Sequence, residues 1–171
     1  MDEGKTPTPA AEALPSGRFS GRLEFQQLVR DALARAAKEG WRELILSDAD
    51  FADWPLGERA VAESLGAWAA SGRKCTLLAS RYDTLSVRHA RFVAWRRAWS
   101  HIIEARGCVS ADPLDVPSAI WSPGWVLQRM DPERCNGYCG AEPERRLLLR
   151  ESMNQWLAKS SPAFPATTLG L

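Results

Sequence analysis

The sequence lacks the features by which several classes of protein are recognised. It has no apolar run near the ~20 residues that a bilayer-spanning helix requires, so we expect no membrane partner. It has little net charge, since 22 Lys and Arg face 21 Asp and Glu, and this balance makes a nucleic-acid partner unlikely. The acidic, Pro-rich N-terminus lacks the apolar segment of a signal peptide. The expected location is therefore cytoplasmic.

Catalytic and metal-binding motifs are also scarce. The chain has two His, and it contains no nucleophile elbow, P-loop or dinucleotide-binding glycine motif. Cys135 and Cys139 would lie about 13 Å apart on a strand, too far to share one ion. The acidic loop 48–53 lacks the glycine and the closing glutamate of a calcium loop. We expect no metal, no cofactor and free thiols.

Apolar periodicity predicts alternating helices and strands. Apolar residues recur at intervals of three and four between Leu23 and Lys38, which is typical of a helix, and Gly40 ends it. The short apolar runs 43–47 and 75–79 are predicted strands joined by a helix over 56–71, which indicates a parallel crossover. The other predicted elements are a helical region over 84–99 with a potential break at Ala90, strands at 101–106, 119–121, 125–130 and 135–139, and a helix from 142 onward.

These elements predict an α/β fold, a mixed sheet with βαβ crossovers, a C-terminal β-hairpin and flanking helices. Residues 1–17 are Pro-rich and poor in large apolar side chains, so we expect them to form a disordered leader. A single domain should then span 18–171, with an irregular tail from Ser160 onward.

Polar residues follow the predicted strands at their carboxyl ends. Ligands of open α/β sheets bind beyond these ends, so this group is a candidate site for a small polar or phosphorylated ligand. The candidate ligand-binding residues are Asp48, Asp50, Arg81, Asp83, His89 and Arg96. The alternative is purely structural: the acidic segment 43–63 and the Arg-rich segment 88–106 pair with each other or are solvated.

The chain has eight Trp, and their positions suggest different roles. Trp68, Trp99 and Trp156 fall on apolar helical stripes and are predicted core residues. Trp121 and Trp125 flank a turn and are candidate interface residues. Trp95 lies within the Arg88–Arg97 segment, where a basic and aromatic mixture could stack nucleic-acid bases.

Three segments carry a resemblance to a known family: 46–59 (LSDADFADWPLGER), 92–99 (FVAWRRAW) and 161–171 (SPAFPATTLGL). They resemble a proteobacterial family of unknown activity that is considered phospholipase D-like in fold. The order of predicted elements is likewise similar to one half of the phospholipase D superfamily. The superfamily's H-x-K-x₄-D motif is missing from the hairpin at 125–131, which contains no His and no Lys. The resemblance therefore implies a catalytically degenerate half domain.

Phospholipase D-like halves pair across a shared face, so the resemblance implies a homodimer of this chain, with Trp121 and Trp125 as its anchors. The expected function is a non-catalytic phospholipase D-like binding or regulatory module in a bacterium. Two alternatives stay open. One is an enzyme that acts on a small polar or phosphorylated ligand at the strand ends, because catalytic residues meet in space rather than in sequence. The other is a nucleic-acid-binding protein that uses the Arg88–Arg97 segment.

Overall fold

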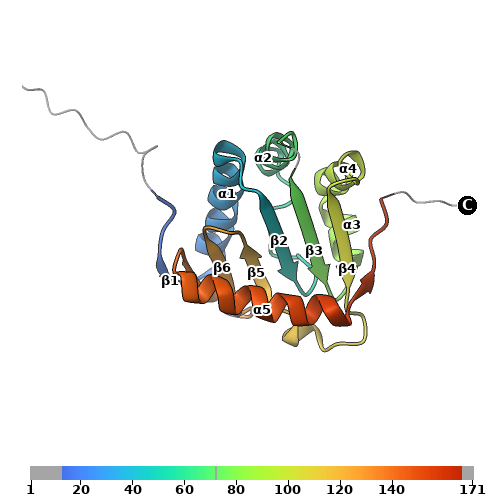
Figure 1. Ribbon diagram of the computed structural model, residues 1–171. Coiled ribbons are helices and arrows are strands. Elements are labelled where there is room, and N and C mark those ends of the chain that lie inside the picture. The colour runs from blue at the N-terminus through green and yellow to red at the C-terminus, as the bar shows by residue number, and fades with distance from the viewer. Residues whose placement is uncertain (1–12, 72, 167–171) are drawn as a thin grey trace, which may run out of the picture.

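The computed structural model describes residues 13–71 and 73–166, which form one eight-stranded sheet with helices on both faces (Figure 1). The strands lie in the order β1-β7-β6-β5-β2-β3-β4-β8. Helices α1 to α4 cover one face, and α5 crosses the other. The strands are β1 (Gly17–Phe19), β2 (Glu43–Asp48), β3 (Lys74–Ala79), β4 (Ile103–Gly107), β5 (Ser118–Trp121), β6 (Val126–Asp131), β7 (Asn136–Gly140) and β8 (Ser161–Pro162). The helices are α1 (Arg22–Glu39), α2 (Arg59–Ala69), α3 (Asp83–Arg88), α4 (Ala90–Ala98) and α5 (Pro143–Lys159), with a 3₁₀ turn at Pro113–Asp115.

One half of the sheet is parallel. Strand β3 pairs in parallel with β2 and with β4, which confirms the predicted crossovers. The two faces of β2 divide the core: Leu44 and Leu46 contact the layer of α1 to α4, and Ile45 lies on the side of α5. None of the described helices is both long and apolar enough to cross a membrane.

The other half is antiparallel. Strand β5 pairs with β2, and β6 and β7 form the predicted hairpin. The result is the predicted mixed α/β sheet.

Local sequence determines where the helices end. Gly40 adopts a left-handed conformation, and its N–H donates to the carbonyl of Ala36, which stops α1 as predicted. The helical region 83–98 breaks at His89, one residue before the potential break at Ala90, and this gives α3 and α4.

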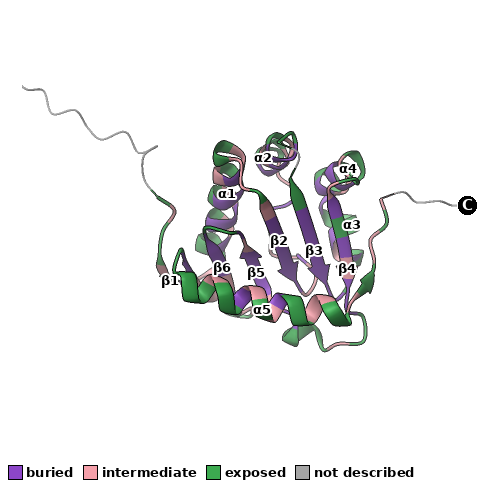
Figure 2. Cartoon of the chain, in the orientation of Figure 1, coloured by how far each residue is buried: buried purple, intermediate pink, exposed green. Residues whose placement is uncertain are grey.

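Helix α5 packs weakly. Leu149 and Met153 are its two buried residues, and they contact Ile45, Ala119 and Val126 of the sheet. Its outer face is exposed along most of its length (Figure 2). Trp156, a predicted core residue, is half-buried.

The core prediction for the other two tryptophans has a mixed outcome. Trp68 is fully buried, and its Nε1 donates to the carbonyl of Trp41 at 2.7 Å. Trp99 is only half-buried and packs at the margin of the core.

The prediction of a disordered leader is wrong for residues 13–17. Strand β1 pairs with β7, and Leu14 packs against the core. The carbonyl of Pro15 accepts from Trp125 Nε1 at 3.0 Å and from the Cys139 thiol at 3.5 Å. Composition could not indicate this three-residue edge strand, because its partner β7 is distant in the chain and Phe19 is its one core residue, stacked on Phe25. The remaining part of the predicted leader, 1–12, lies outside the described residues.

Candidate functional site

Asp48 ends β2 and is 2% exposed. Its Oδ1 accepts from Arg129 Nη2 at 2.9 Å, and its Oδ2 accepts from the backbone N–H groups of Asp50 and Phe51. Both oxygens are therefore occupied by the chain itself. Asp48 holds the loop that follows β2 and does not face a cavity.

Arg129 of β6 is the partner that the sequence analysis missed. Its side chain is 4% exposed, and it donates to Asp48, to Asp53 Oδ2 at 3.0 Å, to Ser118 Oγ at 3.0 Å and to the Cys135 sulfur at 3.4 Å. Burial disfavours its charge, but the Asp48 carboxylate and the bonds to Cys135 and Asp53 outweigh burial and raise the pKa of Arg129. Because Leu127 and Arg129 share one strand face, an inward-facing arginine was the signal available in the sequence.

His89 is also used internally. It is 6% exposed, and its Nε2 donates to the carbonyl of Phe51 at 2.9 Å. The bond joins the break between α3 and α4 to the loop after β2. Asp50 caps the same loop, because its Oδ1 accepts from the N–H of Ala52.

The structure does not gather the six predicted ligand-binding residues into one site. Arg81 and Asp83 are exposed near the start of α3. Arg96 is buried on α4 and lines a cavity beside β4, and neither Asp48 nor His89 is among the residues that line it. The predicted polar site therefore divides into a closed internal network, two surface residues and one separate buried arginine.

The acidic and Arg-rich segments do not pair with each other as a unit. The acids of 43–63 bond mainly to arginines of other elements: Glu43 to Arg150, Asp48 and Asp53 to Arg129, and Glu58 to Arg30. The hydrogen bonds between the two segments run to backbone carbonyls, from His89 to Phe51 and from Arg91 to Gly57, and not to the acidic side chains.

The candidate interface tryptophans are covered by their own chain. Trp125 is 4% exposed and lies beneath the segment at Pro15. Trp121 is half-buried, donates to the carbonyl of Arg146 and carries the Arg150 guanidinium over its ring at 4.5 Å. Neither forms an exposed anchor. Trp95 is 5% exposed, so it cannot stack on a base as the nucleic-acid alternative requires.

An unpredicted group of cations lies at the amino end of the parallel strands. We call it the basic edge and define it as Lys38, Arg42, Arg73, Lys74, Arg97 and His101. All six are exposed, and none forms an ion pair with another described residue. Arg73, Lys74 and His101 line one shallow hollow of about 380 Å³.

Three members of the basic edge precede the parallel strands. Arg42 and Arg73 come directly before β2 and β3, and the N–H of Lys74 donates to the carbonyl of Arg42. His101 lies in the turn that leads into β4.

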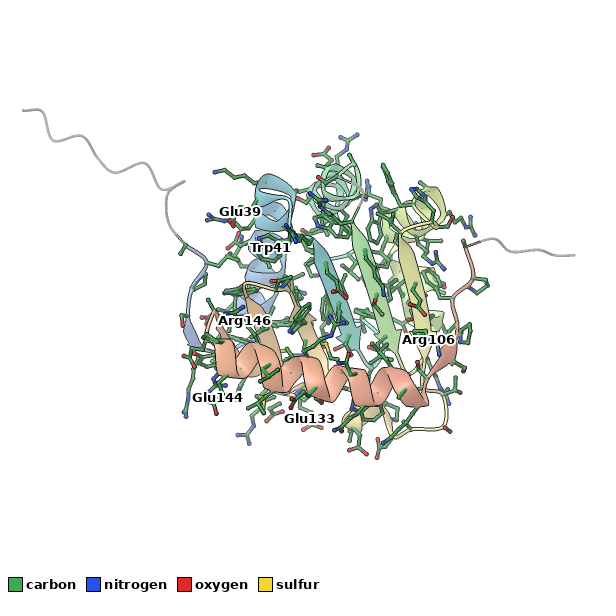
Figure 3. The ribbon with its side chains drawn as sticks, in the orientation of Figure 1. Glu39, Trp41, Arg106, Glu133, Glu144 and Arg146 are labelled. Carbon is green, nitrogen blue, oxygen red and sulfur yellow. The ribbon has the colours of Figure 1, made fainter. Side chains whose placement is uncertain are left out.

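The acids nearest the basic edge have partners of their own. Glu39, visible beside Trp41 in Figure 3, accepts from Trp41 Nε1. Glu43 pairs with Arg150, and Glu104 pairs with Arg106. No ion pair joins these carboxylates to the basic edge, although Glu104 lines the same hollow as Arg73, Lys74 and His101.

Comparison with known proteins yields a fold relationship. No protein-family model matches the chain, and no curated protein matches it. A solved structure of TrmBL2, an archaeal chromatin protein described as showing a novel mode of DNA binding, superposes with a TM-score of 0.63 at 14% sequence identity. The match covers 95% of this chain and 57% of that one, so this chain spans little more than half of TrmBL2. At this identity the likeness shows a shared fold.

Proposed function

We propose that the chain is a non-catalytic binding module that contacts the phosphate backbone of a nucleic acid through the basic edge. The observation that carries the proposal is that Arg42, Arg73 and His101 lie exposed just before three neighbouring parallel strands, and that none of them pairs with a carboxylate of the described chain. Arginine and lysine side chains bind phosphate oxygens and release counterions when they do so.

The exposure of these side chains suits contacts to a phosphate backbone. Lys74 lines the same hollow as Arg73 and His101. Such contacts carry no sequence information, and the binding is therefore expected to be non-specific.

The near-neutral composition does not oppose this proposal once the charges are placed in space. The net charge of +1 is a sum over the whole surface, whereas association depends on the local field. The DNA-binding character of TrmBL2 is consistent with the proposal at the level of fold analogy. The match covers 57% of TrmBL2, so the analogy extends to that part of TrmBL2.

The proposal that the module is non-catalytic rests on the way the polar residues at the strand ends are bonded within the chain. Asp48 and His89, the residues best suited to acid–base chemistry, bond to the loop after β2 and to Arg129.

A phospholipase D-like ancestry is the accompanying proposal. It rests on the order of elements and on the three sequence segments, and the comparisons give it no support. The homodimer that this ancestry implies is likewise a proposal.

Fluorescence anisotropy with a labelled random-sequence duplex tests the function. The wild-type chain should bind with a dissociation constant between about 10⁻⁶ and 10⁻⁴ M at moderate salt, the range of non-specific binding. The double variant Arg42→Ala/Arg73→Ala should weaken binding at least about tenfold, since each arginine contributes about one phosphate contact.

Arg81→Ala/Arg88→Ala is the matched control, because it removes two exposed arginines near α3 and leaves the basic edge intact. This control should bind like the wild type. An equal loss in both double variants would indicate a diffuse charge effect, and a loss in the control alone would favour the Arg88–Arg97 segment. Either result would reject the basic edge.

A further inference from the structure

Arg96 is a buried cation without a counter-ion. It is 7% exposed, and no ion pair joins it to a carboxylate of the described chain. Its one recorded hydrogen bond runs from Nε to the carbonyl of Phe164 at 3.3 Å. Nη1 is enclosed and has no partner.

The contrast with Arg129 shows that this state is unusual within the same molecule. The two arginines are almost equally buried, at 7% and 5% exposure. Arg129 is surrounded by two carboxylates, a hydroxyl and a thiol. The groups whose charge affects Arg96 are the Tyr82 hydroxyl and the Cys75 thiol, and burial lowers its pKa.

An uncompensated buried charge costs several kcal/mol of stability in general, and an arginine cannot discharge itself by losing its proton. Natural proteins retain such costs mainly at functional sites. A hydrogen-bond acceptor supplied from outside the described chain would explain why the buried charge of Arg96 is retained.

The side chain of Arg96 lines a cavity of about 510 Å³ at the edge of β4. The cavity exists because β8 covers only part of that edge. Its register ends at Arg106 and Gly107, and a last bond runs from Ala163 N–H to the carbonyl of Ala105. A volume of this size falls in the range of small-molecule sites.

The uncovered edge also supplies backbone groups. Because the carbonyl of Ile102 accepts from the N–H of Cys75 on β3, the alternation of strand hydrogen bonding directs the N–H and C=O of Ile103 away from β3, toward the open edge. The described chain places no strand against Ile103. The cavity therefore combines a guanidinium with a backbone donor.

The remaining walls limit the chemistry of the ligand. Ile103, Ala105, Pro162 and Pro165 are apolar. Arg106, which lies on β4 toward α5 (Figure 3), bonds to Ser160 and pairs with Glu104, so its guanidinium is already engaged. The Glu104 carboxylate at the rim opposes a second negative charge on a ligand.

We propose that this cavity binds a small organic monocarboxylate, with its carboxylate on Arg96 and its apolar body against Ile103 and the two prolines. The planar guanidinium matches a carboxylate in two-point geometry. This cavity shares Ile103 and Glu104 with the hollow at the basic edge, but Arg96 lines the cavity and not that hollow. The tests therefore read out Arg96 itself.

The first test follows the Nε–Hε resonance of Arg96 by NMR in the wild-type chain while sodium benzoate is added, with sodium chloride at matched ionic strength as the reference. The Arg96 resonance should shift and saturate with benzoate. An unmoved resonance would overturn the proposal, even if no variant could be prepared. A larger response to inorganic phosphate than to benzoate would overturn the choice of a monocarboxylate.

The second test compares thermal unfolding of Arg96→Met and Arg88→Met with and without benzoate. Arg88 is an exposed arginine on α3, outside both the cavity and the basic edge. Saturating benzoate should raise the midpoint of the wild type and of Arg88→Met by at least about 2 °C and leave Arg96→Met unchanged. Without benzoate, Arg96→Met should unfold no earlier than the wild type, because it removes an uncompensated charge. A benzoate shift that persists in Arg96→Met would refute the site.

Discussion

Arg129 joins three parts of the chain that are distant in sequence. Its guanidinium connects the loop after β2, through Asp48 and Asp53, to Ser118 of β5 and to the hairpin turn at Cys135. The guanidinium carbon of Arg129 also lies 4.6 Å from the centre of the Phe25 ring of α1. Arg129 therefore ties the loop at the carboxyl end of β2 to β5 and to the hairpin, while Asp48 and His89 bond to the loop backbone.

We expect Arg129→Met to destabilise the fold by about 3–5 kcal/mol, because it leaves Asp48 buried without its counter-charge. Chemical denaturation measures this loss. Arg134→Met, on the exposed turn of the same hairpin, should change stability by less than about 0.5 kcal/mol. Adding Asp48→Asn to Arg129→Met should cost less than the sum of the single changes, since the two residues interact directly. If the two losses of stability were strictly additive, a direct interaction between Arg129 and Asp48 would be contradicted.

Cys139 should resist alkylation near neutral pH. Burial raises the pKa of its thiol to about 11, so about one molecule in a thousand carries the reactive thiolate at pH 8. Labelling with iodoacetamide, located by mass spectrometry, should accelerate about tenfold per pH unit up to that pKa.

The raised pKa of Cys139 also makes the stability of the fold depend on pH. A thiol with a raised pKa in the folded state stabilises the fold fully below its unfolded pKa of about 8.5, and this contribution is lost as the pH rises toward 11. Complete labelling of folded protein at pH 8, at the rate seen in denaturant, would contradict the burial of Cys139.

Among the elements, the β6–β7 hairpin has the tightest backbone packing. Gly137 pairs with Phe19 of β1 and with Arg129 of β6. A Cβ there would stand 1.9 Å from the carbonyl oxygen of Gln128 and 2.8 Å from the Phe19 ring. The register of β6 and β7 also shifts between Arg129 and Asp131.

Gly137→Ala should therefore destabilise the protein by at least about 2 kcal/mol, because backbone must move to admit a methyl group. Gly124→Ala is the matched control, since a Cβ at Gly124 meets nothing within 4 Å. It should leave the unfolding midpoint nearly unchanged. Equal midpoints for the two variants would show that the three strands pack more loosely than described.

Most elements could be predicted from the sequence because their patterns are local. Strands β2 and β3 are continuous apolar runs, and α1 has a complete apolar stripe ended by Gly40. Strands β1 and β8 could not be predicted, because three and two residues carry no periodicity and their pairing partners are distant in the chain.

The candidate sites depend on long-range geometry and were harder to predict. Arg42, Arg73 and His101 come to one end of the sheet only because β2, β3 and β4 are neighbours in it. Arg96 was selected as a candidate ligand-binding residue together with Asp48 and His89, but those two residues are bonded elsewhere. The residue types in the sequence identified candidate site residues. Contacts between distant parts of the chain decided which of these residues have no partner within the described chain.

At the scale of the whole molecule, the proposed homodimer is still open. A chain that holds one half of a phospholipase D-like pair should show the mass of two chains by sedimentation equilibrium at tens of micromolar protein. The mass of one chain under these conditions would exclude the homodimer. Trp125→Asp is unsuitable as a dissociating variant, because Trp125 is 4% exposed in its own chain and the change would unfold it.

The proposed function places the nucleic acid at the amino ends of the parallel strands, where the basic edge lies. At the carboxyl end of β2, Asp48 and Asp53 are paired with Arg129.

The salt dependence of duplex binding tests the central claim most directly. In a plot of the logarithm of the binding constant against the logarithm of salt concentration, between about 50 and 200 mM, each phosphate contact contributes a slope of about −0.9. Relative to wild type, Arg42→Ala/Arg73→Ala should reduce the magnitude of the slope by about 1.8, and Arg81→Ala/Arg88→Ala should leave it unchanged. A wild-type affinity independent of salt, or equal slopes for the wild type and Arg42→Ala/Arg73→Ala, would contradict a phosphate-binding role for the basic edge.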